Sequence, residues 1–171
     1  MKNYLSHFAT FVDFPKPGVL FYDFSPLLRK PKVMTELILD MAEKVKDIEF
    51  DVIAGIDARG FIFGAMLASH LGKGFVMMRK TGKLPGVVFE YHYDLEYGRD
   101  SLCVQQHILK AKEKVLIIDD VLGTGGTAKA ATALVEAAKA QVAALVFVLE
   151  VPVLKGREVL KAFKIVSLND I

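Results

Sequence analysis

The sequence predicts an α/β fold in which a mostly parallel, twisted sheet is flanked by helices. Three observations support this prediction. Apolar strand-like runs alternate with helix-like segments through the middle of the chain, which is typical of βαβ units. The clearest strands are continuous aliphatic runs, as expected for strands covered on both faces. Finally, 53% of the 171 residues are hydrophobic, which is enough to build the core of a single domain spanning 1–171.

Each element follows from a local pattern. Short β-branched and aliphatic runs predict strands, and longer Ala- or Leu-rich segments bounded by Gly or Pro predict helices. The run KVLIIDD is the clearest strand. In chain order, the predicted elements are helix 31–46, strand 51–56, helix 61–71, strand 74–80, strand 114–120, helix 127–140 and strand 141–150.

Three segments depart from this alternation and divide the domain. Residues 1–30 are rich in proline and predict an extended segment before the core at 31–150. Residues 81–101 form a long polar and aromatic connection, and such loops are usually functional or disordered. We expect this connection to be mobile. We also expect the tail at 151–171 to fold back and pair with the N-terminal segment as a cap.

Composition and charge argue against several classes of protein. The net charge of +2 gives no reason to expect a nucleic-acid partner, and no apolar run approaches the roughly 18 residues of a membrane span. The N-terminus lacks the apolar stretch of a signal peptide. The single Cys103 cannot form an intrachain disulfide and is predicted to be a small buried residue. We therefore expect a cytoplasmic protein without a membrane or nucleic-acid partner.

The most informative stretch is KVLIIDDVLGTGGTAKAA, residues 114–131, in which Asp119 and Asp120 precede a glycine-rich turn. The turn lies at a predicted helix N-terminus, where free N–H groups and the helix dipole favour an anion. Carboxylates, by contrast, accept hydrogen bonds from hydroxyl groups. Ribose 5-phosphate presents both a phosphate and vicinal hydroxyls, so one ligand accounts for both features. The predicted phosphate loop consists of Gly123, Thr124, Gly125, Gly126 and Thr127.

Other interpretations of this stretch explain less. The spacing does not fit a Walker loop. Gly123, Gly125 and Ala128 do match the dinucleotide fingerprint, and Glu150 ends the next strand, but two carboxylates would then lie beside the pyrophosphate. A helix N-cap preceded by surface acids accounts for Thr127 and leaves the glycines unexplained.

VLIIDDVLGTGGT resembles the phosphoribosyl-diphosphate (PRPP) binding motif of type I phosphoribosyltransferases. Further segments resemble the adenine phosphoribosyltransferase family, in the same order and at similar spacing: DFPKPGVLFYDFSPLL, GIDARGFIFGAMLA, RKTGKLPG, YDLEYGRDSL and LKGRE. The resemblance covers nearly the whole chain. It implies the type I phosphoribosyltransferase fold with a small hood over the core, and the transfer of phosphoribose from PRPP to adenine, giving AMP and pyrophosphate.

The resemblance also implies a pyrophosphate site. DARG follows the strand at 51–56, so Arg59 is expected at the carboxyl edge of the sheet, where open α/β sheets bind ligands. The family often carries a non-proline cis peptide in this loop, here expected at Asp57–Ala58. The expected pyrophosphate-binding residues are Asp57, Ala58, Arg59, Arg79, Lys80 and Lys83.

The resemblance further assigns the base site and the catalytic residues. Phe21 and Val121 would cover the two faces of the purine, and the backbone around Leu20 and Tyr22 would read it. The family commonly has arginine at the position of Tyr22 and often alanine at that of Gly123. Glu96 and Tyr97 are assigned to a lid within 81–101. The expected catalytic residues are Glu96, Arg59, Asp119 and Asp120.

The scattered histidines show no metal-ligand spacing, so no direct protein ligand is expected for a metal. Mg²⁺ is still expected, bound through PRPP and bridged by water to Asp119 or Asp120. The resemblance also implies a homodimer. Two alternatives stay open: a phosphoribosyltransferase for another purine base, such as hypoxanthine or guanine, and a PRPP-sensing regulator without catalysis.

Overall fold

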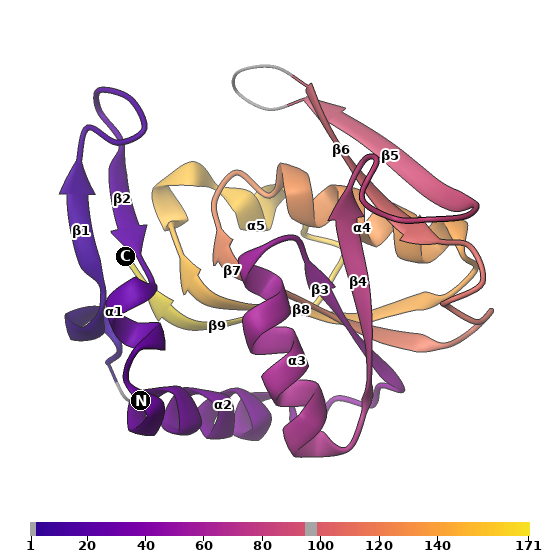
Figure 1. The fold of residues 1–171 in the computed structure, drawn as a ribbon, viewed down its shortest axis with the longest axis horizontal. Coiled ribbons are helices and arrows are strands. Elements are labelled where there is room, and N and C mark those ends of the chain that lie inside the picture. Colours follow the sequence, from indigo (N-terminus) through magenta and orange to yellow (C-terminus); the bar gives the residue numbers. More distant parts are fainter. Residues whose placement is uncertain (1–2, 95–98) are drawn as a thin grey trace.

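The computed structural model describes residues 3–94 and 99–171, and it has the predicted α/β architecture (Figure 1). The helices are η1 (Leu5–His7), α1 (Ser25–Leu28), α2 (Pro31–Val45), α3 (Arg59–Leu71), α4 (Gly126–Ala137), η2 (Pro152–Leu154) and α5 (Gly156–Val159). The strands are β1 (Ala9–Val12), β2 (Leu20–Asp23), β3 (Val52–Ile56), β4 (Gly74–Lys80), β5 (Val88–Asp94), β6 (Arg99–Gln105), β7 (Lys114–Leu122), β8 (Gln141–Glu150) and β9 (Ile165–Asp170).

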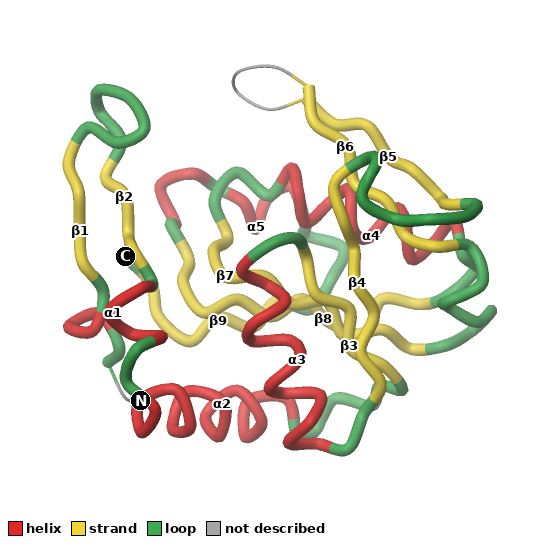
Figure 2. The backbone as a smooth tube through the Cα atoms, viewed as in Figure 1, coloured by secondary structure: helices red, strands yellow, loops and turns green. Residues whose placement is uncertain are grey.

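The central sheet has seven strands in the order β5-β6-β4-β3-β7-β8-β9. The pairs from β4 through β3, β7 and β8 to β9 are parallel, whereas β6 pairs antiparallel with both β4 and β5. Strands β1 and β2 form a separate antiparallel pair beside the core (Figure 2). The prediction of a mostly parallel sheet is therefore confirmed.

Helices cover both faces of the sheet, which explains why its central strands β3, β7 and β8 are built largely from apolar residues. Every residue of β3 is buried. One core cluster packs α4 against one face of the sheet, and the other packs α2 and α3 against the opposite face. Cys103 is buried in β6, as predicted. Within the described part of the chain, no helix has the length and apolar character that crossing a membrane requires.

Glycines set how closely α3 approaches the sheet. The ring of Phe75 fills the space beside Gly55 and Gly64, where an added Cβ at either position would lie 2.7 Å from a ring carbon. At the start of α3, a Cβ on Gly60 would lie 2.6 Å from the Ile118 carbonyl oxygen. These contacts hold the N-terminus of α3 against the end of β7.

The connection at 81–101 differs from its prediction. We expected a long irregular loop, but the described part contains β5 and the start of β6, which pair as an antiparallel hairpin. The hairpin joins the sheet through β4, where Arg79 is opposite Cys103. Tyr93 of β5, together with Leu102 and Val104 of β6, is buried in the core, which joins the hairpin to the rest of the domain.

The C-terminal tail also differs. Instead of pairing with the N-terminal segment, β9 pairs in parallel with β8 and becomes an edge strand of the central sheet. The N-terminal segment pairs with itself through β1 and β2. The tail still contacts that segment, because the Tyr4 backbone N–H donates to Asn169 Oδ1 over 3.1 Å. Strand β9 therefore extends the central sheet beside β8 instead of forming a cap with the N-terminal segment.

Candidate functional site

The two predicted ligand-binding motifs meet at one edge of the sheet. β3 and β7 are parallel neighbours, so the loop after β3 and the loop after β7 emerge side by side at their carboxyl ends. The first loop carries Asp57 and leads into α3. The second follows Asp119 and Asp120 and leads into α4.

The carboxylate pair is held in an environment that resists a second negative charge. Asp120 is buried, and its backbone N–H donates to Asp119 Oδ1 over 2.9 Å. Burial, together with the neighbouring charge of Asp120, raises the pKa of Asp119 well above its ordinary value. Asp120 Oδ2 makes an ion pair with Arg59 and accepts no further hydrogen bond from the described residues, so a hydroxyl-bearing ligand that displaced Arg59 could bond to it.

Arg59 balances part of this charge. It is the first residue of α3, and its Nε forms an ion pair with Asp120 Oδ2. Its guanidinium carbon also lies 5.8 Å from the ring centroid of Phe21 and 5.4 Å from that of Phe24. Arg59 therefore connects the carboxylate pair to the N-terminal hairpin.

A second cluster surrounds Asp57. Arg79 Nε donates to Asp57 Oδ2 over 3.3 Å, and Lys83 Nζ lies 3.7 Å from the same oxygen. Arg79 also donates to the Lys83 carbonyl oxygen over 3.3 Å. The Asp57–Ala58 peptide bond is cis, as predicted. The structure thus brings together four of the six residues predicted to bind pyrophosphate.

Lys80 belongs to a different cluster. It follows Arg79 along β4, and successive side chains of a strand point to opposite sides. Its ammonium pairs with Asp100 and donates to the Tyr93 hydroxyl over 2.8 Å. Burial opposes the charge, but these hydrogen bonds raise the pKa of Lys80 above its ordinary value. Lys80 therefore anchors the β5–β6 hairpin, away from Asp57.

The predicted phosphate loop occupies the turn between β7 and α4. Gly125 has φ +84°, a left-handed conformation that favours glycine, and an added Cβ there would lie 3.0 Å from the Gly156 carbonyl oxygen. A Cβ on Gly156 would collide with the Gly123 carbonyl oxygen and lie 2.7 Å from Leu122 Cδ1. No side chain caps the N-terminus of α4, which leaves its first N–H groups available to an anion.

Gly156 is a residue whose role the sequence reasoning missed. Its only signal was its position in LKGRE, one of the segments that carried the family resemblance. Behind the phosphate loop it acts as the support against which Gly123 and Gly125 rest.

The predicted base-binding residues lie on β2 and β7. Leu20 is exposed, and the ring of Phe21 meets that of Phe14 edge-on at 5.0 Å. Tyr22 and Val121 are partly buried and pack against the same core cluster. Tyr22, where the family commonly has arginine, is therefore held partly by core packing.

Glu96 and Tyr97, assigned to a lid and to catalysis, lie outside the described residues.

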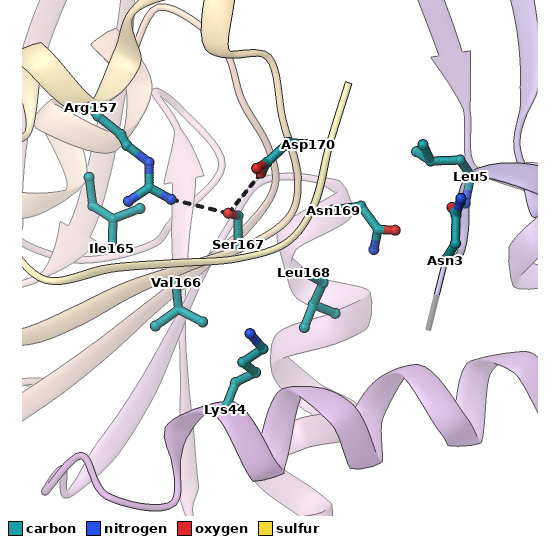
Figure 3. Close-up of a pocket in the computed structure, with 10 residues that line it drawn as sticks. All are labelled: Asn3, Leu5, Lys44, Arg157, Ile165, Val166, Ser167, Leu168, Asn169 and Asp170. Atoms are coloured by element: carbon teal, nitrogen blue, oxygen red, sulfur yellow. Dashed lines mark hydrogen bonds between the residues drawn. The ribbon is translucent and has the colours of Figure 1, made fainter. Parts of the chain in front are cut away.

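A groove of about 530 Å³ lies elsewhere, along the edge strand β9 (Figure 3). Arg157, on its wall, donates to both carboxylate oxygens of the buried Glu150 over 2.6 Å each. Glu150, which ends the strand after the dinucleotide-like glycines, is thus already bound by Arg157. This groove contains none of the predicted site residues.

Residues 26–170 match the family described as the phosphoribosyl transferase domain. The chain belongs to the phosphoribosyl transferase family. It is 47% identical over 165 residues to the adenine phosphoribosyltransferase of Francisella tularensis subsp. tularensis, a match that covers 95% of this chain and 94% of that protein.

Solved structures of other phosphoribosyltransferases agree with this assignment. The crystal structure of adenine phosphoribosyltransferase from Thermoanaerobacter pseudethanolicus superimposes with a TM-score of 0.95 at 41% identity, covering 97% of this chain and 96% of that one. The Saccharomyces cerevisiae enzyme, complexed with an imino-altritol bisphosphate and adenine, gives a TM-score of 0.87 at 40% identity, covering 94% and 93%. The expected type I phosphoribosyltransferase fold is confirmed.

Proposed function

We propose that this protein is a purine-salvage enzyme that transfers the 5-phosphoribosyl group from PRPP to adenine, giving AMP and pyrophosphate. The observation that carries the proposal is one shared sheet edge. There, a carboxylate pair, one oxygen of which is paired with the partly exposed Arg59, lies next to an uncapped helix N-terminus and near a cluster of cations. The similarity to enzymes named adenine phosphoribosyltransferase supports adenine as the base.

The phosphate loop and the carboxylates would hold the sugar. The N–H groups at the start of α4, with the hydroxyls of Thr124 and Thr127, bind the 5-phosphate. Asp119 and Asp120 accept hydrogen bonds from the 2′- and 3′-hydroxyls. The negative charge of this pair also favours the positive charge that develops on the ribose as the anomeric C–O bond breaks.

The cluster at Asp57 would receive the leaving group. Arg79 and Lys83 are partly exposed cations that converge on the loop at Asp57–Ala58. Their charges stabilise the pyrophosphate as it departs, which is where a fixed cation lowers the barrier most. Lys80 joins them only if its ammonium leaves Asp100.

Mg²⁺ fits this donor set. The described residues contain no cluster of three or more carboxylate, histidine or cysteine side chains suited to a metal. Mg²⁺, however, prefers water and substrate phosphates to a cage made of protein groups. Asp119 and Asp120 would hold it through water, and when bound it neutralises charge on the diphosphate of PRPP.

The base would lie between the hood and the end of β7. Phe21 offers an aromatic face and Val121 an aliphatic one, and the backbone at Leu20 and Tyr22 supplies hydrogen bonds. Because Tyr22 packs against the core, its replacement of the family's usual arginine leaves this backbone in place.

A homodimer is the assembly that we propose. Four large apolar side chains, Leu39, Ile62, Met66 and Met77, are between 37% and 48% exposed on α2, α3 and β4. Beside them, a groove of about 450 Å³ between α2 and α3 includes Leu39 and Met66. A second copy would cover this surface, as the family resemblance implies. We place the protein in the cytoplasm, whose reducing conditions suit the unpaired Cys103.

The test is product formation from Mg-PRPP with adenine, hypoxanthine, guanine or xanthine in turn, followed by chromatography. AMP from adenine alone is the expected result. A nucleotide from another base would keep the chemistry and change the substrate. Tight PRPP binding without any nucleotide product would refute the enzyme and favour a regulator.

A further inference from the structure

The Arg59 side chain lies between the carboxylate pair and the aromatic residues of the N-terminal segment. We predicted that it binds pyrophosphate, yet its contacts are with Asp120 and with the aromatic residues Phe21 and Phe24. Asp57, Arg79 and Lys83 form their own cluster without it. Arg59 therefore occupies the places that the proposed function gives to the ribose hydroxyls and to the purine.

The two sets of contacts compete with ligand for physical reasons. A guanidinium is planar and stacks on aromatic rings much as a base does. With the Arg59 guanidinium carbon 5.8 Å from the centre of the Phe21 ring, a purine that stacks on the same face of that ring has to displace Arg59. Likewise, the Asp120 oxygen paired with Arg59 is less available to a ribose hydroxyl.

Movement of Arg59 is feasible. Its side chain is 42% exposed, whereas that of Asp120 is 8% exposed, so the arginine is the partner with room to leave. Its backbone is fixed as the first residue of α3, with Gly60 packed against the end of β7. Only the side chain has to rotate.

We propose that Arg59 is a positioning residue that couples the two binding sites: its contacts with Asp120 and Phe21 compete with both ligands, and either ligand releases it for the other. This inference rests on the proposed function. The first ligand to bind breaks the contacts of Arg59, and the second does not have to break them again, so the two bind with positive cooperativity. A cation–π contact and a partly exposed ion pair of this kind correspond to a coupling of about fivefold in affinity.

The experiment measures the adenine dissociation constant by calorimetry, with and without saturating ribose 5-phosphate. Ribose 5-phosphate has no leaving group, so no reaction disturbs the measurement. For the unaltered protein we expect adenine to bind about fivefold tighter when the sugar phosphate is present. In Arg59→Gln, adenine alone should bind more tightly than to the unaltered protein, and the effect of the sugar phosphate should largely disappear. Arg79→Gln is the matched control, because it removes a neighbouring arginine that touches neither Asp120 nor Phe21 and should keep the coupling.

Coupling that survives in Arg59→Gln, or that is absent from the unaltered protein, would overturn the inference. If Arg59→Gln fails to fold because Asp120 loses its partner, a crystal structure of the unaltered protein with adenine and ribose 5-phosphate decides instead. Arg59 displaced from Asp120 and Phe21 would support the inference, and Arg59 still paired there would refute it. The AMP assay separates the two proposals. AMP formation combined with persistent coupling in Arg59→Gln rejects this inference alone, whereas the absence of any nucleotide rejects the proposed function.

Discussion

Replacing Gly156 with alanine tests whether the phosphate loop depends on its support. The added methyl group would collide with the Gly123 carbonyl oxygen and lie 2.7 Å from Leu122 Cδ1. The collision involves backbone, so the loop itself has to shift. Forcing a methyl into a packed site of this kind costs about 1–3 kcal/mol. For a chain of this size, that corresponds to a fall in Tm of roughly 2–12 °C.

The assay combines thermal unfolding with steady-state kinetics. We expect Gly156→Ala to lower Tm and to raise the KM for PRPP, because the N–H groups that bind the 5-phosphate move with the loop. Gly72→Ala is the control. Gly72 ends α3 with φ +62° and has nothing within 4 Å of an added Cβ, so its substitution costs about 1 kcal/mol in backbone strain. Its KM should not change.

The outcomes separate packing from function. A lower Tm with an unchanged KM for PRPP would mean that the loop at Gly123 does not bind the phosphate. An unchanged Tm would mean that Gly156 is not packed against the Gly123 carbonyl group.

Two further predictions concern carboxylates. Asp119→Asn with Asp120→Asn should lower turnover about 100-fold or more while the protein stays folded, because the charge that favours the transition state is removed; turnover equal to that of the unaltered protein would refute their role. At Glu150, hydrogen bonds from Arg157 hold the pKa below its ordinary value, so the pair stabilises the fold at pH values above about 4.3 and loses that contribution as the pH falls through the lowered pKa. Glu150→Gln should therefore cost about 2 kcal/mol of unfolding free energy at neutral pH, as for the loss of a hydrogen bond to a charged group, and weaken the dependence on acid, measured by urea unfolding at pH 3 to 7; an unchanged acid dependence would mean that Glu150 is not the responsible group.

The sequence was most informative where the structural signal is local. A continuous aliphatic run predicts a buried strand by itself, and β7 with its glycine-rich turn was located in this way. The hairpin at β5 and β6 was missed because β5 mixes polar and aromatic residues and the apolar run of β6 spans only 102–104. The role of these strands becomes apparent only when β4 is their neighbour. The strand β9 was missed for a similar reason, since its partner β8 defines it.

Within the candidate site, the sequence likewise does not predict contacts between individual side chains that depend on the fold. The sequence places Arg79, Lys80 and Lys83 together in one expected pyrophosphate site, but the alternation of β4 directs Arg79 to Asp57 and Lys80 to Asp100. The contact between Arg59 and Asp120 joins residues far apart in the chain, and no local pattern predicts it. The motifs therefore predicted which loops meet at the candidate site, and the fold determines which side chains face each other within it.

The ring of Phe75 sets the distance between α3 and β3 by its own thickness, much as a spacer does between two plates. Gly55 and Gly64 leave room for that ring. A larger residue at either glycine would therefore have to be matched by a smaller one at position 75. Arg59 is the first residue of the same helix. The packing of Phe75 between the two glycines therefore also affects the position of the Arg59 guanidinium. Compensating pairs of substitutions at these positions, chosen without touching any ligand contact, offer a way to move Arg59 by fractions of an ångström.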